Sequence, residues 1–175
     1  MTERFARTLI VGGTGMLAQV SEALSQASGH LTLAARNPSP LAHRLRADAL
    51  PLDWNEHAAT RAALASLPPQ DLIIAWLHRQ GEWMHPLLLD KRTPTGRMIR
   101  LFSSRSSREI VERHARLEEN ALRKGEQHVV LGWMNRAGTS RWLTDEEICD
   151  SVREAVDFPD KALIIAGSLE PPLPL

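Results

Sequence analysis

Three glycines stand within four residues, directly after an apolar run near the start of the chain. The stretch from Thr8 reads TLIVGGTGML, and a segment with helical spacing follows it. The backbone N–H groups at the start of a helix are unpaired and the helix dipole is positive there, so a pyrophosphate is stabilised when the chain can approach it closely. Glycine permits that approach. The pattern therefore predicts a dinucleotide site that is formed by Gly12, Gly13, Thr14, Gly15, Met16 and Leu17.

A turn that binds no ligand is the alternative interpretation of these glycines. Their spacing, Gly12-x-x-Gly15-x-x-Ala18, differs from the strict G-x-G-x-x-G fingerprint of dinucleotide sites. The context nevertheless favours a nucleotide, because an apolar run precedes the turn and a helical segment and a second apolar run follow it. Three glycines so close together also cost backbone entropy without adding packing.

The second apolar run ends in an arginine, where an NAD site normally has an aspartate or glutamate for the adenosine ribose. The chain reads LAARNP around Arg36 and has no acidic residue until Asp48. An arginine would bind a 2′-phosphate through charged, forked hydrogen bonds, so the predicted cofactor is NADP, with NADPH preferred over NADH. A solvated surface arginine is the alternative. Asp53, after the third run, is a candidate partner for the adenine amino group or, equally, a helix cap.

A histidine and a tryptophan follow the fourth apolar run. If the runs are parallel strands, the carboxyl end of this one lies near the bound dinucleotide. His78 can donate a proton to a developing alkoxide or amine near neutral pH, which makes it a candidate catalytic residue, although it could equally cap a strand or contact a phosphate. Trp76 is a candidate contact for the cofactor or for a planar substrate. Trp83 and His85, a few residues on, are weaker candidates.

Short apolar runs alternate with longer segments of helical spacing along the chain, which indicates parallel strands joined by crossover helices. Runs such as DLIIA and ALIIA are apolar throughout, as in strands that helices cover on both faces. We therefore expect an α/β fold: a single-domain, doubly wound, Rossmann-like parallel sheet of six to seven strands in residues 1–169, with a proline-rich extended tail at 170–175. The expected strands are 8–12, 31–35, 50–52, 71–77, 98–102, 128–133 and 162–166, and the expected helices are 16–27, 55–67, 107–124 and 144–158. The last helix begins with a capping box, Thr144 to Glu147.

GGTGML at 12–17, AARNP after the second run and LDW at 52–54 together resemble the short-chain dehydrogenase/reductase superfamily, particularly its atypical, NmrA-like or truncated members. The resemblance implies a serine after the fifth strand, which Ser103 or Ser104 matches. It also implies a Tyr-x-x-x-Lys pair on the next helix. The chain contains no tyrosine, and the nearest match places Asn120 four residues before Lys124. An asparagine cannot deliver a proton at neutral pH, so the usual proton donor is missing.

Two functions are compatible with these residues. The first is an NADP-dependent oxidoreductase of atypical short-chain type, which transfers hydride to or from a small carbonyl or imine compound. Its catalytic residues would be Ser103 and Ser104, which orient the polar atom that receives charge, and His78, which supplies the proton. The second is a non-catalytic NADP(H)-binding sensor or scaffold, which the absence of tyrosine favours.

Composition and missing motifs argue against other classes. The chain has 21 Lys and Arg and 21 Asp and Glu, so its formal net charge is zero, unlike a nucleic-acid or anionic-membrane binder. It lacks C-x-x-C and H-E-x-x-H metal motifs, the phosphate-binding P-loop and the serine elbow. A single cysteine and no secretory signal or membrane-length apolar stretch give a cytoplasmic expectation. The expected partner is a small-molecule substrate, and whether copies of the chain form a homo-oligomer is left open.

Overall fold

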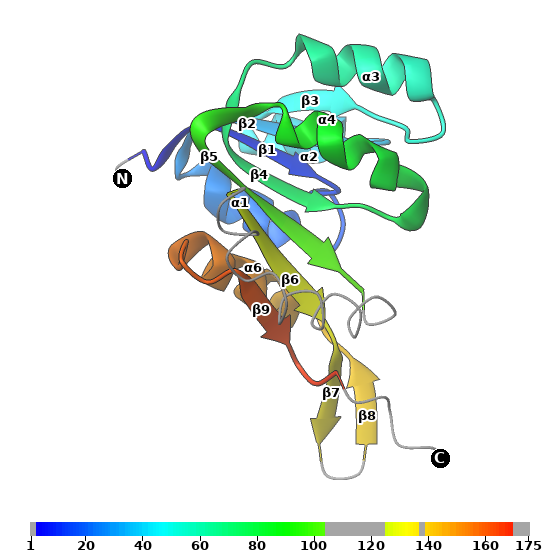
Figure 1. Ribbon diagram of the computed structural model, residues 1–175, viewed down its shortest axis with the longest axis vertical. Coiled ribbons are helices and arrows are strands. Elements are labelled where there is room, and N and C mark those ends of the chain that lie inside the picture. Colours follow the sequence, from blue (N-terminus) through cyan, green and yellow to red (C-terminus); the bar gives the residue numbers. More distant parts are fainter. Residues whose placement is uncertain (1–2, 104–124, 137–138, 170–175) are drawn as a thin grey trace. The chain divides into compact units, whose positions relative to one another are not determined.

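The computed structural model describes residues 3–103, 125–136 and 139–169. Seven strands form a parallel sheet in the order β3-β2-β1-β4-β5-β6-β9, and β7 and β8 form a separate hairpin (Figure 1). The predicted Rossmann-like α/β fold is therefore confirmed. The chain divides into two compact units, Met1–Met98 and Ile99–Leu175. Within the described ranges, no helix has the length and apolar character that crossing a membrane requires.

In the first unit, successive strands are added first on one side of β1 (β2 and β3) and then on its other side (β4 and β5). β1 pairs in parallel with β2 on one side and with β4 on the other, and Val11 of β1 aligns with both Ala34 and Ala75. The carboxyl ends of the three strands are thus level, which creates the crevice where ligands of doubly wound sheets bind. The elements of this unit are β1 (Phe5–Val11), α1 (Ala18–Ser25), β2 (Ser28–Ala35), α2 (Ser39–Leu45), β3 (Asp48–Pro51), α3 (His57–Ser66), β4 (Gln70–Trp76), the 3₁₀ helix η1 (Arg79–Met84), α4 (His85–Leu89) and most of β5 (Arg92–Phe102).

Both faces of the sheet in this unit are apolar. Leu9 and Val11 belong to a buried cluster with Leu64 of α3 and Leu88 of α4. Ile10, whose side chain points to the opposite face, lies against the turn before α1, since a Cβ on Gly13 would come within 2.8 Å of its Cγ2. Successive residues of β1 therefore bury their side chains on opposite faces, as the uniformly apolar sequence of the run predicts.

The second unit is built on β6 (Glu126–Leu131) and β9 (Leu163–Ala166), which pair in parallel. The helix α6 (Asp145–Asp157) buries an apolar face that consists of Ile148, Cys149, Val152, Ala155 and Val156. The hairpin of β7 (Trp133–Arg136) and β8 (Thr139–Trp142) completes the described part of the unit. The expected helix 107–124 and the tail 170–175 lie outside the described residues.

Among the differences from the sequence-based expectation, one strand end and one additional helix have identifiable reasons. The expected strand 128–133 is wrong at its end: it stops at Leu131, and Trp133 starts β7 and exchanges backbone hydrogen bonds with Ser168. At Gly132 a Cβ would lie 2.2 Å from the Ser168 carbonyl oxygen, so the chain can turn there only as glycine. Helix α2 was not among the expected helices; Pro40 stands in its first turn, where proline is compatible with a helix.

The capping box of α6 is confirmed and has a measurable consequence for stability. Glu147 N–H donates to Thr144 Oγ1 over 3.2 Å, and Thr144 N–H donates to the Glu147 carboxylate over 2.9 Å. Replacing Thr144 with alanine is expected to lower the free energy of unfolding by about 1 kcal/mol. Urea unfolding at pH 7 measures the loss, and Thr95→Ala, at an exposed position of β5, is the control.

The stabilisation that Glu147 provides should depend on pH. Hydrogen bonds from Arg141 and from the Thr144 backbone lower the pKa of this carboxyl from 4.5 to about 2 in the folded chain. A folded-state pKa below the unfolded value means that the stabilisation is present above pH 4.5 and is lost as the pH falls towards 2. Glu147→Gln should therefore destabilise the fold at pH 7 more than at pH 3, and an equal effect at both would contradict this assignment.

Candidate cofactor-binding site

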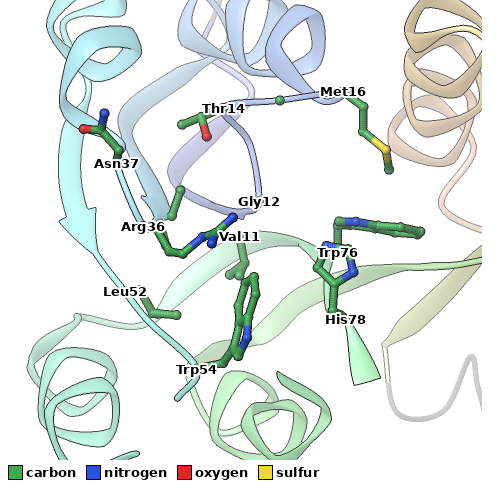
Figure 2. A pocket seen from close by; sticks show the side chains of 13 residues that line it. Val11, Gly12, Thr14, Met16, Arg36, Asn37, Leu52, Trp54, Trp76 and His78 are labelled. Atoms are coloured by element: carbon green, nitrogen blue, oxygen red, sulfur yellow. The ribbon is translucent and has the colours of Figure 1, made fainter. Parts of the chain in front are cut away.

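A pocket of about 580 Å³ opens in the first unit at the level carboxyl ends of β1, β2 and β4 (Figure 2). It lies where the strand order reverses, which is the usual ligand position in an open α/β sheet. Four segments supply its walls: the turn after β1, the end of β2, the loop after β3 and the end of β4. The lining residues are Val11, Gly12, Thr14, Gly15, Met16, Ala34, Ala35, Arg36, Asn37, Leu52, Trp54, Trp76 and His78.

The three glycines of the first turn have three different environments. Gly12 has a φ of 82°, and a Cβ on it would lie 3.3 Å from the Cβ and the carbonyl oxygen of Trp76, so the turn passes close to the end of β4. A Cβ on Gly13 would meet Ile10 and the Ser21 hydroxyl at 2.8 Å, which shows that this glycine lets α1 pack on the sheet. At Gly15 a Cβ would meet nothing within 4 Å. Only Gly12 and Gly15 line the pocket.

The amino end of α1 follows the lining residues Gly15 and Met16 directly. Leu17 is the N-cap residue, and within the described chain no side chain caps this helix and no acidic residue stands in its first turn. The Ser21 hydroxyl instead donates to the carbonyl oxygens of Gly13 and Leu17, which fixes the shape of the turn. The positive end of the helix dipole is therefore not compensated by a carboxylate beside the pocket, an arrangement that suits an anion.

Arg36 contributes the positive charge on the opposite wall. Its guanidinium carbon lies 5.5 Å from the centre of the Trp54 ring, and Figure 2 shows the side chain reaching into the space between Gly12 and Trp54. Arg36 has no hydrogen bond or ion pair with any other residue in the part of the chain that the structure describes. None of the residues that line the pocket is acidic. The site therefore combines a helix amino end with a guanidinium whose donors are available to a phosphate.

Aromatic rings form the remaining wall. The His78 ring lies 5.5 Å from the Trp54 ring and 5.5 Å from the Trp76 ring, measured between centroids. His78 is also the N-cap residue of η1, and its carbonyl oxygen accepts a hydrogen bond from Gly81 N–H over 2.7 Å. The backbone position of His78 is thus fixed, while its exposed imidazole remains at the pocket (Figure 2). This places an imidazole, which can donate or accept a hydrogen bond, at the end of β4.

The structure brings together seven of the residues that the sequence nominated for the site: Gly12, Thr14, Gly15, Met16, Arg36, Trp76 and His78. Gly13 and Leu17 are buried behind the turn. Asp53 does not line the pocket. Its carboxylate accepts hydrogen bonds from the backbone and side chain of Asn55, and it does not cap α3, whose N-cap residue is Glu56 and which has no side-chain cap.

None of the remaining candidates that the structure describes is among the residues that line the pocket. Ser103 belongs to the second unit, directly after β5, and Ser104 lies outside the described residues. His85 starts α4 and does not line the pocket. Leu52, Trp54 and Asn37 line the pocket although the sequence analysis assigned them no role. The LDW stretch after the third run was the available signal for the first two.

No protein-family profile and no curated protein sequence matches this chain, whereas many solved structures share its fold. The TT0495 protein from Thermus thermophilus is 19% identical with a TM-score of 0.63, over 92% of this chain and 96% of that one. BdcA in complex with NADPH is 12% identical with a TM-score of 0.64, over 94% and 96% of the two chains. The NADH-dependent reductase A1-R′ complexed with NAD is 14% identical with a TM-score of 0.61, over 95% and 97%. This chain therefore shares the α/β fold of these solved structures.

Proposed function

We propose that the chain is an NADP(H)-binding oxidoreductase of atypical short-chain type, which acts on a small carbonyl or imine compound. One observation carries the proposal: the glycine turn, the amino end of α1 and Arg36 border the same pocket, at the carboxyl ends of the central strands. Two proteins of the same fold were solved with nicotinamide dinucleotides, BdcA with NADPH and A1-R′ with NAD, which supports this class of cofactor.

The pocket residues fit such a cofactor in chemical type. The backbone from Gly12 to Met16 would hold the diphosphate, because Gly15 presents no side chain to the pocket and the helix dipole is positive there. Arg36 would bind the 2′-phosphate of the adenosine ribose. Leu52 and Trp54 offer apolar surface to a base, and Trp76 does the same at the end of β4.

Hydride transfer is the chemistry that a bound nicotinamide supplies. The protein must then move a proton, because reduction of a carbonyl or imine places negative charge on its oxygen or nitrogen. We assign this step to His78, whose imidazole would hold the proton on a ring nitrogen and release it to that atom. Ser103 and Ser104 stay a prediction from the sequence, since Ser103 belongs to the second unit and Ser104 lies outside the described residues. Trp54 and Trp76, on either side of His78, would limit the access of water.

A non-catalytic NADP(H) sensor is the second candidate, and one observation favours it. The chain contains no tyrosine, so the phenol that donates the proton in this superfamily's usual mechanism is absent. The two candidates share the cofactor and differ in turnover. An assay of NADPH oxidation over a panel of small carbonyl and imine compounds separates them.

Arg36→Ala tests the choice of cofactor. We expect the variant to lose about 1.5–3 kcal/mol of binding free energy for NADPH, as for hydrogen bonds to a charged group, and to bind NADH nearly as the wild type does. Isothermal titration calorimetry with both nucleotides measures the change. Arg44→Ala is the matched control, because Arg44 pairs with Glu22 and does not line the pocket. An unchanged affinity ratio in Arg36→Ala would refute the NADP assignment.

A further inference from the structure

Trp54 contacts both Arg36, the proposed phosphate-binding residue, and His78, the proposed proton donor. Its ring lies 5.5 Å from the Arg36 guanidinium carbon and 5.5 Å from the centre of the His78 ring. Figure 2 shows the indole standing beneath Arg36, with Leu52 on one side. Neither the sequence motifs nor the comparisons assign a role to this side chain.

The Arg36 guanidinium carbon lies over the Trp54 ring. A cation over an aromatic ring is attracted by the electron density of the ring face, and this contact does not pair the guanidinium with a carboxylate or another strong acceptor, which leaves its donors available to a phosphate. Among the described residues, Arg36 forms no hydrogen bond or ion pair, and the ring it lies over is that of Trp54. The indole therefore restricts the arginine without occupying the donors that a phosphate requires.

A second layer holds Trp54 in place. Its carbonyl oxygen accepts a hydrogen bond from Trp83 Nε1 over 3.2 Å. The Trp83 ring is in turn stacked on His57, with 4.4 Å between the centroids, and lies under Arg61 at 4.9 Å. These contacts fix the backbone that carries the indole of Trp54. Arg36, in contrast, has an exposed side chain that can adopt many rotamers. Ordering such a side chain before the ligand arrives reduces the entropic cost of binding.

From this arrangement we infer that Trp54 is a specificity-determining positioning residue, which holds Arg36 ready for the 2′-phosphate and thereby sets the preference for NADPH over NADH. The inference rests on the proposed NADP(H) function. It assigns the preference to a pair of residues, Arg36 and Trp54, and not to the arginine alone.

Calorimetry on the full chain tests the role of Trp54. In Trp54→Leu the NADPH-to-NADH affinity ratio should fall by about 3- to 10-fold, the range for one cation–π contact at a partly exposed site. Trp54→Phe keeps an aromatic face and should restore most of the ratio. A purely structural role would weaken both nucleotides together and leave the ratio unchanged. Trp142→Leu, on the hairpin of the second unit, is the control for loss of a tryptophan.

A double-mutant cycle with Arg36→Ala completes the test. If Trp54 acts through Arg36, Trp54→Leu should have no effect on the affinity ratio once Arg36 is alanine. An unchanged ratio in Trp54→Leu, or an equal change with and without Arg36, overturns the inference and leaves the proposed function standing. Absence of NADPH binding by the wild type removes the proposed function itself, and the role of Trp54 with it.

Discussion

Replacing His78 with glutamine is expected to lower kcat for NADPH-dependent reduction by about 10²- to 10⁴-fold, the usual contribution of a positioned general acid. Glutamine can still hydrogen-bond at the end of β4, but it cannot deliver a proton. The affinity for NADPH should change little, because the contacts of His78 are with the rings of Trp54 and Trp76 and not with the glycine turn. Steady-state kinetics and calorimetry on the same preparation measure the two effects separately.

His85→Gln is the matched control for this substitution. His85 is the first residue of α4, seven positions further along the chain, and does not line the pocket. Its replacement should leave turnover within about twofold of the wild type, as for a residue outside the catalytic machinery. Full activity in His78→Gln would exclude the imidazole as the acid.

The pH dependence of kcat gives an independent readout of His78. A group that must be protonated to act makes the rate of reduction fall as the pH rises through its pKa. The wild type should show this fall, and the residual rate of His78→Gln should not. If the wild type binds NADPH and reduces no compound of the carbonyl and imine panel, the sensor function replaces the enzymatic one.

Local signals in the sequence predicted the fold and the phosphate-binding part of the site, which consists of the glycine turn and Arg36. The apolar runs marked β1 and β4 because strands covered on both faces must be apolar. The apolar run at β9 also marked a strand, although β9 is at the edge of the sheet and Ile165 is exposed. Thr144 and Glu147 marked the start of α6 for an equally local reason, since a capping box lies within four residues. The glycine turn and Arg36 were found because both stand at the ends of such strands.

The aromatic part of the site, Trp54 and the residues that hold it, depends on contacts between residues far apart in the sequence, and no local pattern predicts these contacts. Trp54 reaches Arg36 across 18 positions of chain, and its anchor Trp83 is 29 positions further on. A tryptophan after a short strand is as typical of a core as of a ligand wall, so its type alone could not decide its role. The same reasoning applies to Asp53, whose carboxylate bonds to Asn55 in the loop before α3, a local contact that its residue type alone does not predict.

Two glycines of the first turn have different roles: Gly13 is required for packing, and Gly15 lines the pocket. Gly13→Ala should destabilise the fold by about 1–3 kcal/mol, because the added Cβ would lie 2.8 Å from Ile10 and from the Ser21 hydroxyl in a packed interior. Gly15→Leu should leave the free energy of unfolding unchanged or slightly raised, since its Cβ would meet no atom within 4 Å and the residue has no positive φ.

The effects on binding should be reversed. A leucine at position 15 would occupy the side of the pocket where the diphosphate must approach the backbone, and NADPH affinity should fall by about 2 kcal/mol or more. Gly13→Ala, in the fraction that remains folded, should bind NADPH nearly as the wild type does, because residue 13 does not line the pocket. Urea unfolding and calorimetry on both variants give the four values. If Gly15→Leu bound NADPH normally, the diphosphate could not lie against this turn, and the dinucleotide assignment would be wrong at its foundation.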